Sequence, residues 1–295
     1  LNPRAFGDLG DFYGGQRDMH ERAIRVLHSL SFVEDPTRVF RAIRFEHRFG
    51  FRLGKETLAL IHGAVAMDLF HRLSGHRLLE ELRLLLSEEK PPAALRRLAE
   101  LGLLRFIHPR LAWSARSASL LRAVEETLDW YHLSALEWPE GRTAKPWLVY
   151  LMALLAPLPS RAMEATLTRL GAPAPVMQAV RAGGAAAVRL LRRLAARPAP
   201  RPAQVYRLLS GLPEEVLVLV LAKAKTKSVK RLVVAFLAGG RRAKAALTGA
   251  DLKALGLKPG PRYKQILDRL LDARLNGEVN TLDEERALAA RLAEG

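Results

Sequence analysis

Residues 32–51 read FVEDPTRVFRAIRFEHRFGF, and this stretch decides the fold expected of the chain. Asp35 and Pro36 form an N-cap and a first-turn proline, and Gly50 is a residue type that often ends a helix. Between these signals the apolar residues recur at helical spacing. We therefore predict an amphipathic helix with one side in a core.

Four arginines share the other side of this predicted helix. At about 100° per residue, they fall within about a third of the circumference: Arg38, Arg41, Arg44 and Arg48. Such a row of like charges repels itself unless an anion lies along it. Guanidinium groups grip phosphate oxygens with paired donors, so a triphosphate or an RNA backbone would satisfy the row.

Glu34 and Asp35 stand directly before the arginines and suggest base recognition. Adenine and cytosine both present an amine donor beside a ring-nitrogen acceptor, whereas guanine and uracil present the reverse order. A carboxylate next to a guanidinium matches the first pair of bases. Asp35 and Arg38 are thus predicted to read A or C, at about 1–3 kcal/mol per pairing lost with G or U. Alternatively, Asp35 only caps the helix, Glu34 offsets Arg38 and the row faces water.

Beyond this helix, the chain carries mostly helix signals. Further helix starts are indicated at Ser74, Pro91, Pro92 and Thr248, and loops at Glu137–Pro146, Arg197–Pro202 and Gly256–Pro261. Ala23–Leu27 alternates like a short strand, and no sheet is predicted after Phe51. The expected fold class is mainly α.

The charge of the chain favours a polyanionic partner. It holds 47 Lys and Arg against 30 Asp and Glu, a net charge of +17, which favours nucleic acid over its rival, an anionic membrane surface. Residues 181–244 concentrate the excess, with fifteen basic and two acidic residues. The RNA-binding residues predicted there are Arg189, Arg192, Arg193, Lys223, Lys225, Lys227, Lys230 and Arg231. The alternative is a solvated basic face without a ligand.

Several classes of site are excluded or disfavoured by composition. The chain has no cysteine, which excludes disulfides and thiolate metal sites and fits a reducing, cytoplasmic location. It has no run of 18 uncharged apolar residues, so neither a membrane span nor a membrane partner is predicted. The eight histidines give no helical pair at i, i+4 that would favour a metal site.

Three segments resemble successive motifs of the class II tRNA nucleotidyltransferases and the related bacterial poly(A) polymerases. They are DFYGGQRDM with IRVLHSLSF, EDPTRVFRAIRFEHRFGF, and RLSGHRLLEELRLLLS, and the tail from LTGADLKALG to RLNGEV is similar as well. The resemblance is weaker between about Ala112 and Ala243. It implies an all-helical neck, body and tail behind a short β remnant of the nucleotidyltransferase head. The domains expected are residues 1–30 (end of head and connector), 31–110 (neck), 111–200 (body) and 201–295 (basic, RNA-binding tail).

The resemblance also implies residue roles. Glu34, Asp35 and Arg38 match the EDxxR element, whose Asp and Arg pair with the incoming base while the Glu holds the Arg. Arg41 and Arg44 match basic positions near the nucleotide. The connector, which acts as a hinge in the family, corresponds to Asp11, Gly14, Gly15 and Asp18. Ser74, Arg77 and Glu81 match a motif thought to steady the neck, although a capped helix with an i, i+4 Arg/Glu pair explains them equally well.

The family's chemistry is two-metal nucleotidyl transfer, which needs an Asp-x-Asp pair to hold Mg²⁺. No Asp-x-Asp occurs in these residues, so the Mg²⁺ ligands are expected upstream of Leu1 and the chain alone is expected to be inactive. The implied function is template-independent addition of A, with C left open, to the tRNA 3′ end, using tRNA, ATP and, if C is added, CTP. Poly(A) polymerase and a non-catalytic helical RNA-binding module stay open as alternatives, as does the oligomeric state.

Overall fold

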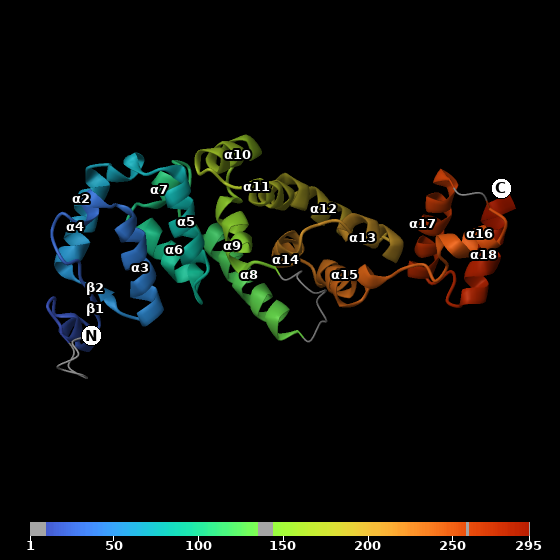
Figure 1. Ribbon diagram of the computed structural model, residues 1–295, viewed down its shortest axis with the longest axis horizontal. Helices are drawn as coiled ribbons and strands as arrows, with labels where there is room; N and C mark the ends of the chain where they lie inside the picture. Colours follow the sequence, from blue (N-terminus) through green and yellow to red (C-terminus); the bar gives the residue numbers. More distant parts are fainter. Residues whose placement is uncertain (1–9, 135–143, 258–259, 295) are drawn as a thin grey trace. The chain divides into compact units, whose positions relative to one another are not determined.

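The structure is a computed structural model that describes residues 10–134, 144–257 and 260–294. Its residues group into two compact units. Unit 1 comprises residues 1–128 and 145–184, and unit 2 comprises residues 129–144 and 185–295. Helices dominate both units (Figure 1), so the mainly α fold class is confirmed. The domain boundaries drawn from the sequence stay predictions.

Unit 1 opens with short elements around one long helix. In chain order these are α1 (Gly15–His20), β1 (Ala23–Ile24), α2 (Ser31–Glu34), α3 (Thr37–Phe49) and β2 (Arg52–Leu53). β1 and β2 pair in parallel, with Ala23 opposite Arg52. The prediction of no sheet after Phe51 was therefore wrong, because a two-residue strand after α3 gains its only ladder partner through tertiary folding.

Helix α3 follows from its local sequence. The carboxylate of Asp35 accepts a hydrogen bond from the Thr37 backbone amide at 3.0 Å, and the helix begins at Thr37, slightly after its predicted start. It ends at Gly50, whose φ of 63° is the left-handed conformation that glycine adopts at low cost. Val39, Phe40 and Ile43 are fully buried. The predicted amphipathic helix is thus confirmed.

Further helices complete unit 1. They are α4 (Lys55–Ala66), η1 (Leu69–Arg72), α5 (Gly75–Leu86), α6 (Pro91–Glu100), α7 (Leu104–Ile107), the first part of α8 (Ala115–Leu133), α9 (Pro146–Leu155), α10 (Ser160–Arg169) and α11 (Ala174–Arg181). Helix α3 contacts α5 and α6, and α5 also contacts α9. Ser74 caps α5 as predicted, by accepting from the Arg77 amide. These contacts bring the start of α5 beside the start of α3.

One glycine sets the path of the chain at the start of α5. A Cβ on Gly75 would lie 1.8 Å from the carbonyl oxygen of Arg169, the last residue of α10. Only a residue without a side chain permits this close backbone approach. Gly75 therefore fixes how closely α5 and α10 pack.

Unit 2 is built on a buried apolar helix. Its elements are α12 (Ala187–Leu194), which follows the π-helical turn η2 (Ala182–Ala186), then α13 (Pro202–Leu209), α14 (Glu214–Lys223), α15 (Lys227–Ala238), η3 (Gly240–Arg242), α16 (Gly249–Ala254), α17 (Pro261–Leu275) and α18 (Leu282–Glu294). Val216 to Val220 of α14 are buried on every side, so this apolar run is a core helix as predicted. None of the described helices is both long and apolar enough to cross a membrane.

The loop predictions can be compared with these helix ends. The chain between α12 and α13 contains the predicted loop Arg197–Pro202, and α13 begins at its last proline. The predicted loop Gly256–Pro261 falls between α16 and α17, apart from residues 258–259, which lie outside the described part. Most of Glu137–Pro146 also lies outside the described residues, and α9 begins at Pro146.

Candidate nucleotide-reading and RNA-binding sites

Asp35 lies between α2 and α3 with its carboxylate held on two sides. Oδ1 accepts from the Thr37 amide at 3.0 Å and from Thr37 Oγ1 at 2.7 Å. Oδ2 accepts from Arg77 Nη2 at 2.9 Å, across to α5. Burial alone would raise the pKa of Asp35, but the hydrogen bonds from Thr37 and the charge of Arg77 outweigh it and hold the pKa below its ordinary value. Asp35 is therefore a firmly ionised carboxylate in a fixed orientation.

Arg38 lies in the first turn of α3 and faces α2. Its Nη1 donates to Ser31 Oγ at 2.9 Å and contacts Glu34 Oε2 at 3.3 Å. The side chain remains 39% exposed. Nε and Nη2 donate to no residue that the structure describes, so one edge of the guanidinium remains available to a ligand.

The side chains of Asp35 and Arg38 do not hydrogen-bond to each other, although the Arg38 backbone amide donates to the Asp35 carbonyl oxygen at 3.1 Å. Asp35 is tied to Thr37 and Arg77, whereas Arg38 is tied to α2. A base that contacts both side chains must form its hydrogen bonds in addition to those that the side chains already make. The carboxylate retains about one open lone-pair site, because three of its roughly four sites are in use.

The arginine row of α3 is divided. Glu88 accepts from Arg48 Nε at 2.8 Å and from Arg48 Nη2 at 2.6 Å, and it lies 3.5 Å from Arg44 Nη1. Arg44 is buried, and its guanidinium lies 4.7 Å from the centre of the Phe45 ring. The inference that the whole row needs an external anion is corrected here, because Glu88 supplies one for half of it. Among the four arginines of the row, Arg41 alone is exposed and makes no hydrogen bond or ion pair to any described residue.

Helix α5 contributes residues whose role the sequence did not reveal. Arg77 contacts Asp35, so the suggested i, i+4 pair with Glu81 is not what the structure shows. Glu81 Oε2 is buried with no hydrogen-bond partner among the described residues. Burial raises the pKa of Glu81, although the nearby charges of Arg44 and Arg41 act in the opposite direction. Arg77 stands 42 residues from Asp35, and only the signature motif containing it hinted at a role.

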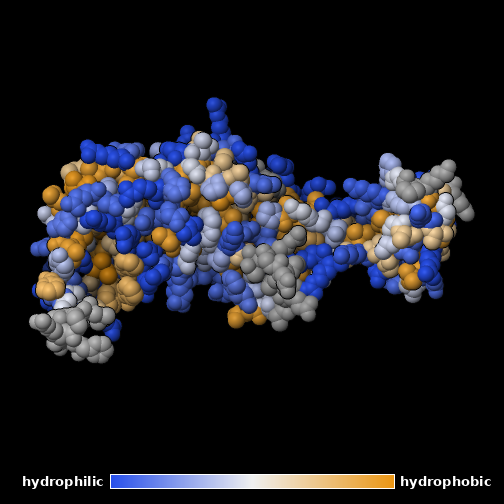
Figure 2. Space-filling model, in the orientation of Figure 1, coloured by the Kyte–Doolittle hydropathy of each residue, from blue (hydrophilic) through white to orange (hydrophobic). Residues whose placement is uncertain are grey.

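The predicted RNA-binding residues fall mainly on two packed helices of unit 2. Arg189, Arg192 and Arg193 are exposed on α12, and Lys227, Lys230 and Arg231 are exposed on α15; α12 and α15 are in contact. Lys225 is exposed just before α15, and Lys223 is half-buried. On the face shown in Figure 2, hydrophilic side chains cover most of the surface, with hydrophobic residues between them. The packing thus brings the basic residues of α12 and α15 into one unit, as an anion-binding surface requires.

The chain is similar to several known proteins. Residues 50–114 match the family model described as "Probable RNA and SrmB-binding site of polymerase A". The chain is 44% identical to the A-adding tRNA nucleotidyltransferase of Geobacter sulfurreducens over 100% of this chain and 33% of the relative. It is 31% identical to the enzyme of the same name from Aquifex aeolicus, over 88% of this chain and 30% of the relative.

Among solved structures, the Thermotoga maritima CCA-adding enzyme complexed with tRNA superposes with a TM-score of 0.80 at 28% identity. The match covers 99% of this chain and 69% of that one. Over nearly its whole length the chain is therefore similar to part of these tRNA nucleotidyltransferases. It spans about a third of the length of the two curated relatives.

The residues predicted to form the connector lie in a compact turn. The carboxylate of Asp11 accepts from the backbone amides of Gly15 at 2.7 Å and Gln16 at 2.8 Å, which caps α1. Gly14 adopts a left-handed φ of 75°. Asp18 pairs with Arg25 in the segment that follows. The hinge role that the resemblance implies for these residues stays a prediction.

Enzymes of this class generally use a divalent metal. Within the described ranges, no group of three or more His, Asp or Glu side chains is placed to hold a metal ion. The described residues therefore do not fit a metal site.

Proposed function

We propose that this chain supplies the nucleotide-reading and RNA-binding parts of an enzyme that adds A to the 3′ end of tRNA without a template, with ATP as donor. The observation that carries the proposal is the Asp35 carboxylate, which is ionised, held by Thr37 and Arg77, and 24% exposed beside the arginines of α3. The 44% identity to an A-adding enzyme supports A as the added base.

Base selection follows from the open positions on Asp35 and Arg38. The remaining acceptor site of Asp35 suits one exocyclic amine, which adenine and cytosine present and uracil lacks. Arg38 can donate through Nε or Nη2 to the adjacent ring nitrogen. Guanine and uracil would place a carbonyl oxygen against the carboxylate and an N–H against the guanidinium. Each mismatched contact costs about 1–3 kcal/mol.

The remaining basic residues are proposed to hold phosphates. Arg41 is exposed at the reading end of α3 and suits the triphosphate of the incoming nucleotide. Arg44 is also proposed to belong to the nucleotide site. Because its guanidinium is buried, it is proposed to act on the neighbouring charges of Arg41 and Glu81 rather than by contact with the nucleotide. The basic residues of α12 and α15 suit the phosphates of the tRNA backbone. Mg²⁺ is the ion proposed for the transfer step, and its ligands are proposed to lie outside the described residues.

Addition of C as well as A is a second candidate, because the same carboxylate and guanidinium accept cytosine. The structural similarity to a CCA-adding enzyme favours it. Purified full-length protein, incubated with tRNA lacking its terminal A or its CCA end and with each nucleotide, separates the two. Extension of any RNA without stopping would identify a poly(A) polymerase instead, and salt-sensitive tRNA binding without nucleotide selectivity would identify an RNA-binding module.

The test of base reading is Asp35→Ala in the full-length protein, with Asp68→Ala as the matched control. Asp68 is also an exposed acid of unit 1 but lies outside the reading site. Discrimination between ATP and GTP, measured as the ratio of kcat/KM values, should fall by about 10- to 100-fold in Asp35→Ala. It should be unchanged in the control. Retention of the wild-type ratio at a near-normal rate would refute the assignment.

A further inference from the structure

We infer that unit 1 carries a second nucleotide-recognition site, a pocket that takes one unpaired base of an RNA strand. The pocket has a volume of about 530 Å³ and is open to solvent. Its lining comes from α6, α7 and the segment that leads into α8. Neither Asp35 nor Arg38 lines it, so it is distinct from the reading site. The inference rests on the proposed RNA-binding function.

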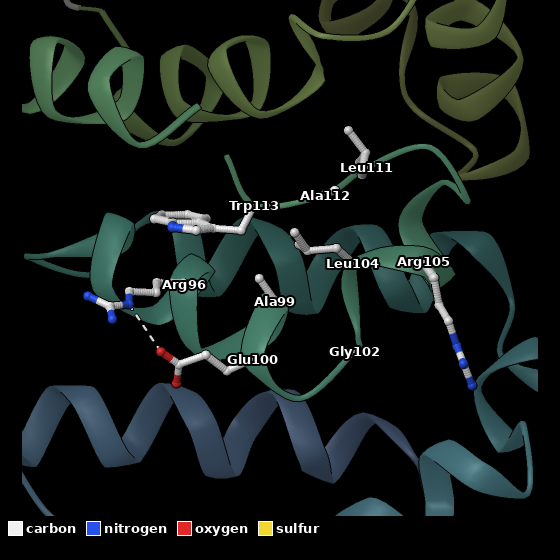
Figure 3. A pocket seen from close by; sticks show the side chains of 9 residues that line it. All are labelled: Arg96, Ala99, Glu100, Gly102, Leu104, Arg105, Leu111, Ala112 and Trp113. Carbon is white, nitrogen blue, oxygen red and sulfur yellow. Dashed lines mark hydrogen bonds and ion pairs between the residues drawn. The ribbon is translucent and has the colours of Figure 1, made fainter. Parts of the chain in front are cut away.

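The pocket has an apolar floor and an aromatic wall. Leu104 and Leu111 are buried residues of its lining, and Ala99 adds a small apolar side chain. The indole of Trp113 is half-buried and lies above Arg96 and Ala99 in Figure 3, with Leu104 to its right. An indole face beside an apolar floor suits a flat aromatic ligand that can stack. The volume lies in the range of about 300–1,000 Å³ typical of small-ligand pockets.

The polar rim suits a base rather than an apolar side chain. Glu100 accepts from Arg96 Nε at 3.0 Å and contacts Arg97 Nη1 at 3.4 Å, which offsets its charge. Its carboxylate remains 46% exposed and can accept from an amine on the edge of a base. Arg96, whose side chain is 67% exposed, can stack on a base or meet its phosphate. Arg105 points away from the indole in Figure 3 and donates to the Val65 carbonyl.

The surrounding charge favours an RNA strand as the source of the base. Residues 90–116 hold six Lys or Arg and one acid, Glu100. A strand whose base enters the pocket would lay its flanking phosphates along this basic segment. Stacking on an aromatic face combined with phosphate contacts is the general mode of single-strand binding. The whole pocket also lies within the residues that match an RNA-binding family model.

The test compares a labelled tetra-adenylate with the same backbone carrying abasic positions, titrated with the 295-residue chain at one fixed salt concentration. Trp113→Ala should weaken binding of tetra-adenylate by about 5- to 150-fold, the equivalent of about 1–3 kcal/mol of base stacking. Binding of the abasic strand should change by less than about twofold. Trp113→Phe, which keeps an aromatic face, should restore most of the affinity.

Two further variants separate pocket binding from folding and from charge. Ala99→Leu fills the pocket at a half-exposed helix position, where leucine is nearly as good a helix former as alanine, and it should reproduce the effect of Trp113→Ala with an unchanged melting temperature. Arg110→Ala removes an exposed charge that does not line the pocket. This variant should weaken binding of the tetra-adenylate and of the abasic strand by the same factor.

Three results would overturn the inference. In the first, Trp113→Ala and Ala99→Leu leave tetra-adenylate affinity unchanged while tRNA binding persists, which refutes the pocket alone. In the second, these variants weaken binding of the tetra-adenylate and of the abasic strand equally. In the third, the wild-type chain binds neither strand nor tRNA, which refutes the proposed RNA-binding function as well.

Discussion

Glu88 is expected to stabilise α3 because it neutralises half of the arginine row from inside the protein. Its side chain is 10% exposed and that of Arg44 is 11% exposed, so replacement by alanine leaves a nearly buried guanidinium without its carboxylate. Breaking such a pair costs about 3–5 kcal/mol. Stacking of Arg44 on Phe45 is present with and without Glu88, so it cancels in this comparison. Arg48, 48% exposed, adds little because water replaces its partner.

We therefore expect Glu88→Ala to lower the local opening free energy of α3 by about 3–5 kcal/mol. Hydrogen exchange read by mass spectrometry on α3 peptides measures this directly, and exchange should accelerate by about 150- to 5,000-fold. Glu80→Ala is the control. Its pair with Arg83 lies within three residues on α5, with both side chains at least 40% exposed, so its loss should cost less than about 1 kcal/mol. Equal exchange in the two variants would refute an internal anion for the row.

Three other variants test different parts of the structure. Gly75→Ala should destabilise unit 1 by more than about 3 kcal/mol, because its Cβ would lie 1.8 Å from a backbone oxygen of Arg169. Gly63→Ala is the control: it lies in open space on α4 and should stabilise unit 1 by up to about 1 kcal/mol. Thermal unfolding measures both effects. Because the pKa of Glu81 is raised in the fold, its contribution to stability is present below about pH 4.5 and is lost as pH rises through the folded pKa. Glu81→Gln should remove this loss, so the melting temperature should vary less with pH across that range. Lys230→Ala should weaken tRNA binding and reduce its salt slope by about one, and an unchanged slope would place Lys230 off the RNA path.

Local signals predicted most of the fold, and long-range pairs account for what was missed. The Asp35 cap, Gly50 and the Ser74 cap act within a few residues, so they can be read directly from the sequence. Glu88 reaches Arg48 across 40 residues, and no periodicity links the two. A charge row that seems to require a ligand can be neutralised by a carboxylate that only the tertiary fold delivers.

The same long-range packing explains why Asp35 can act as a selective reader. A free carboxylate offers about four acceptor sites and can meet water or a nucleotide in many orientations. Two bonds from Thr37 and one from Arg77 leave about one site, and they fix its direction. A base must then present a single amine along that direction, because a carbonyl oxygen there would be an acceptor facing an acceptor and would be repelled. Arg77 thus restricts the geometry that Asp35 accepts. Loss of Arg77 should therefore reduce base discrimination more than it reduces nucleotide affinity, whereas an Arg77 that only competed with the base would give tighter binding when removed.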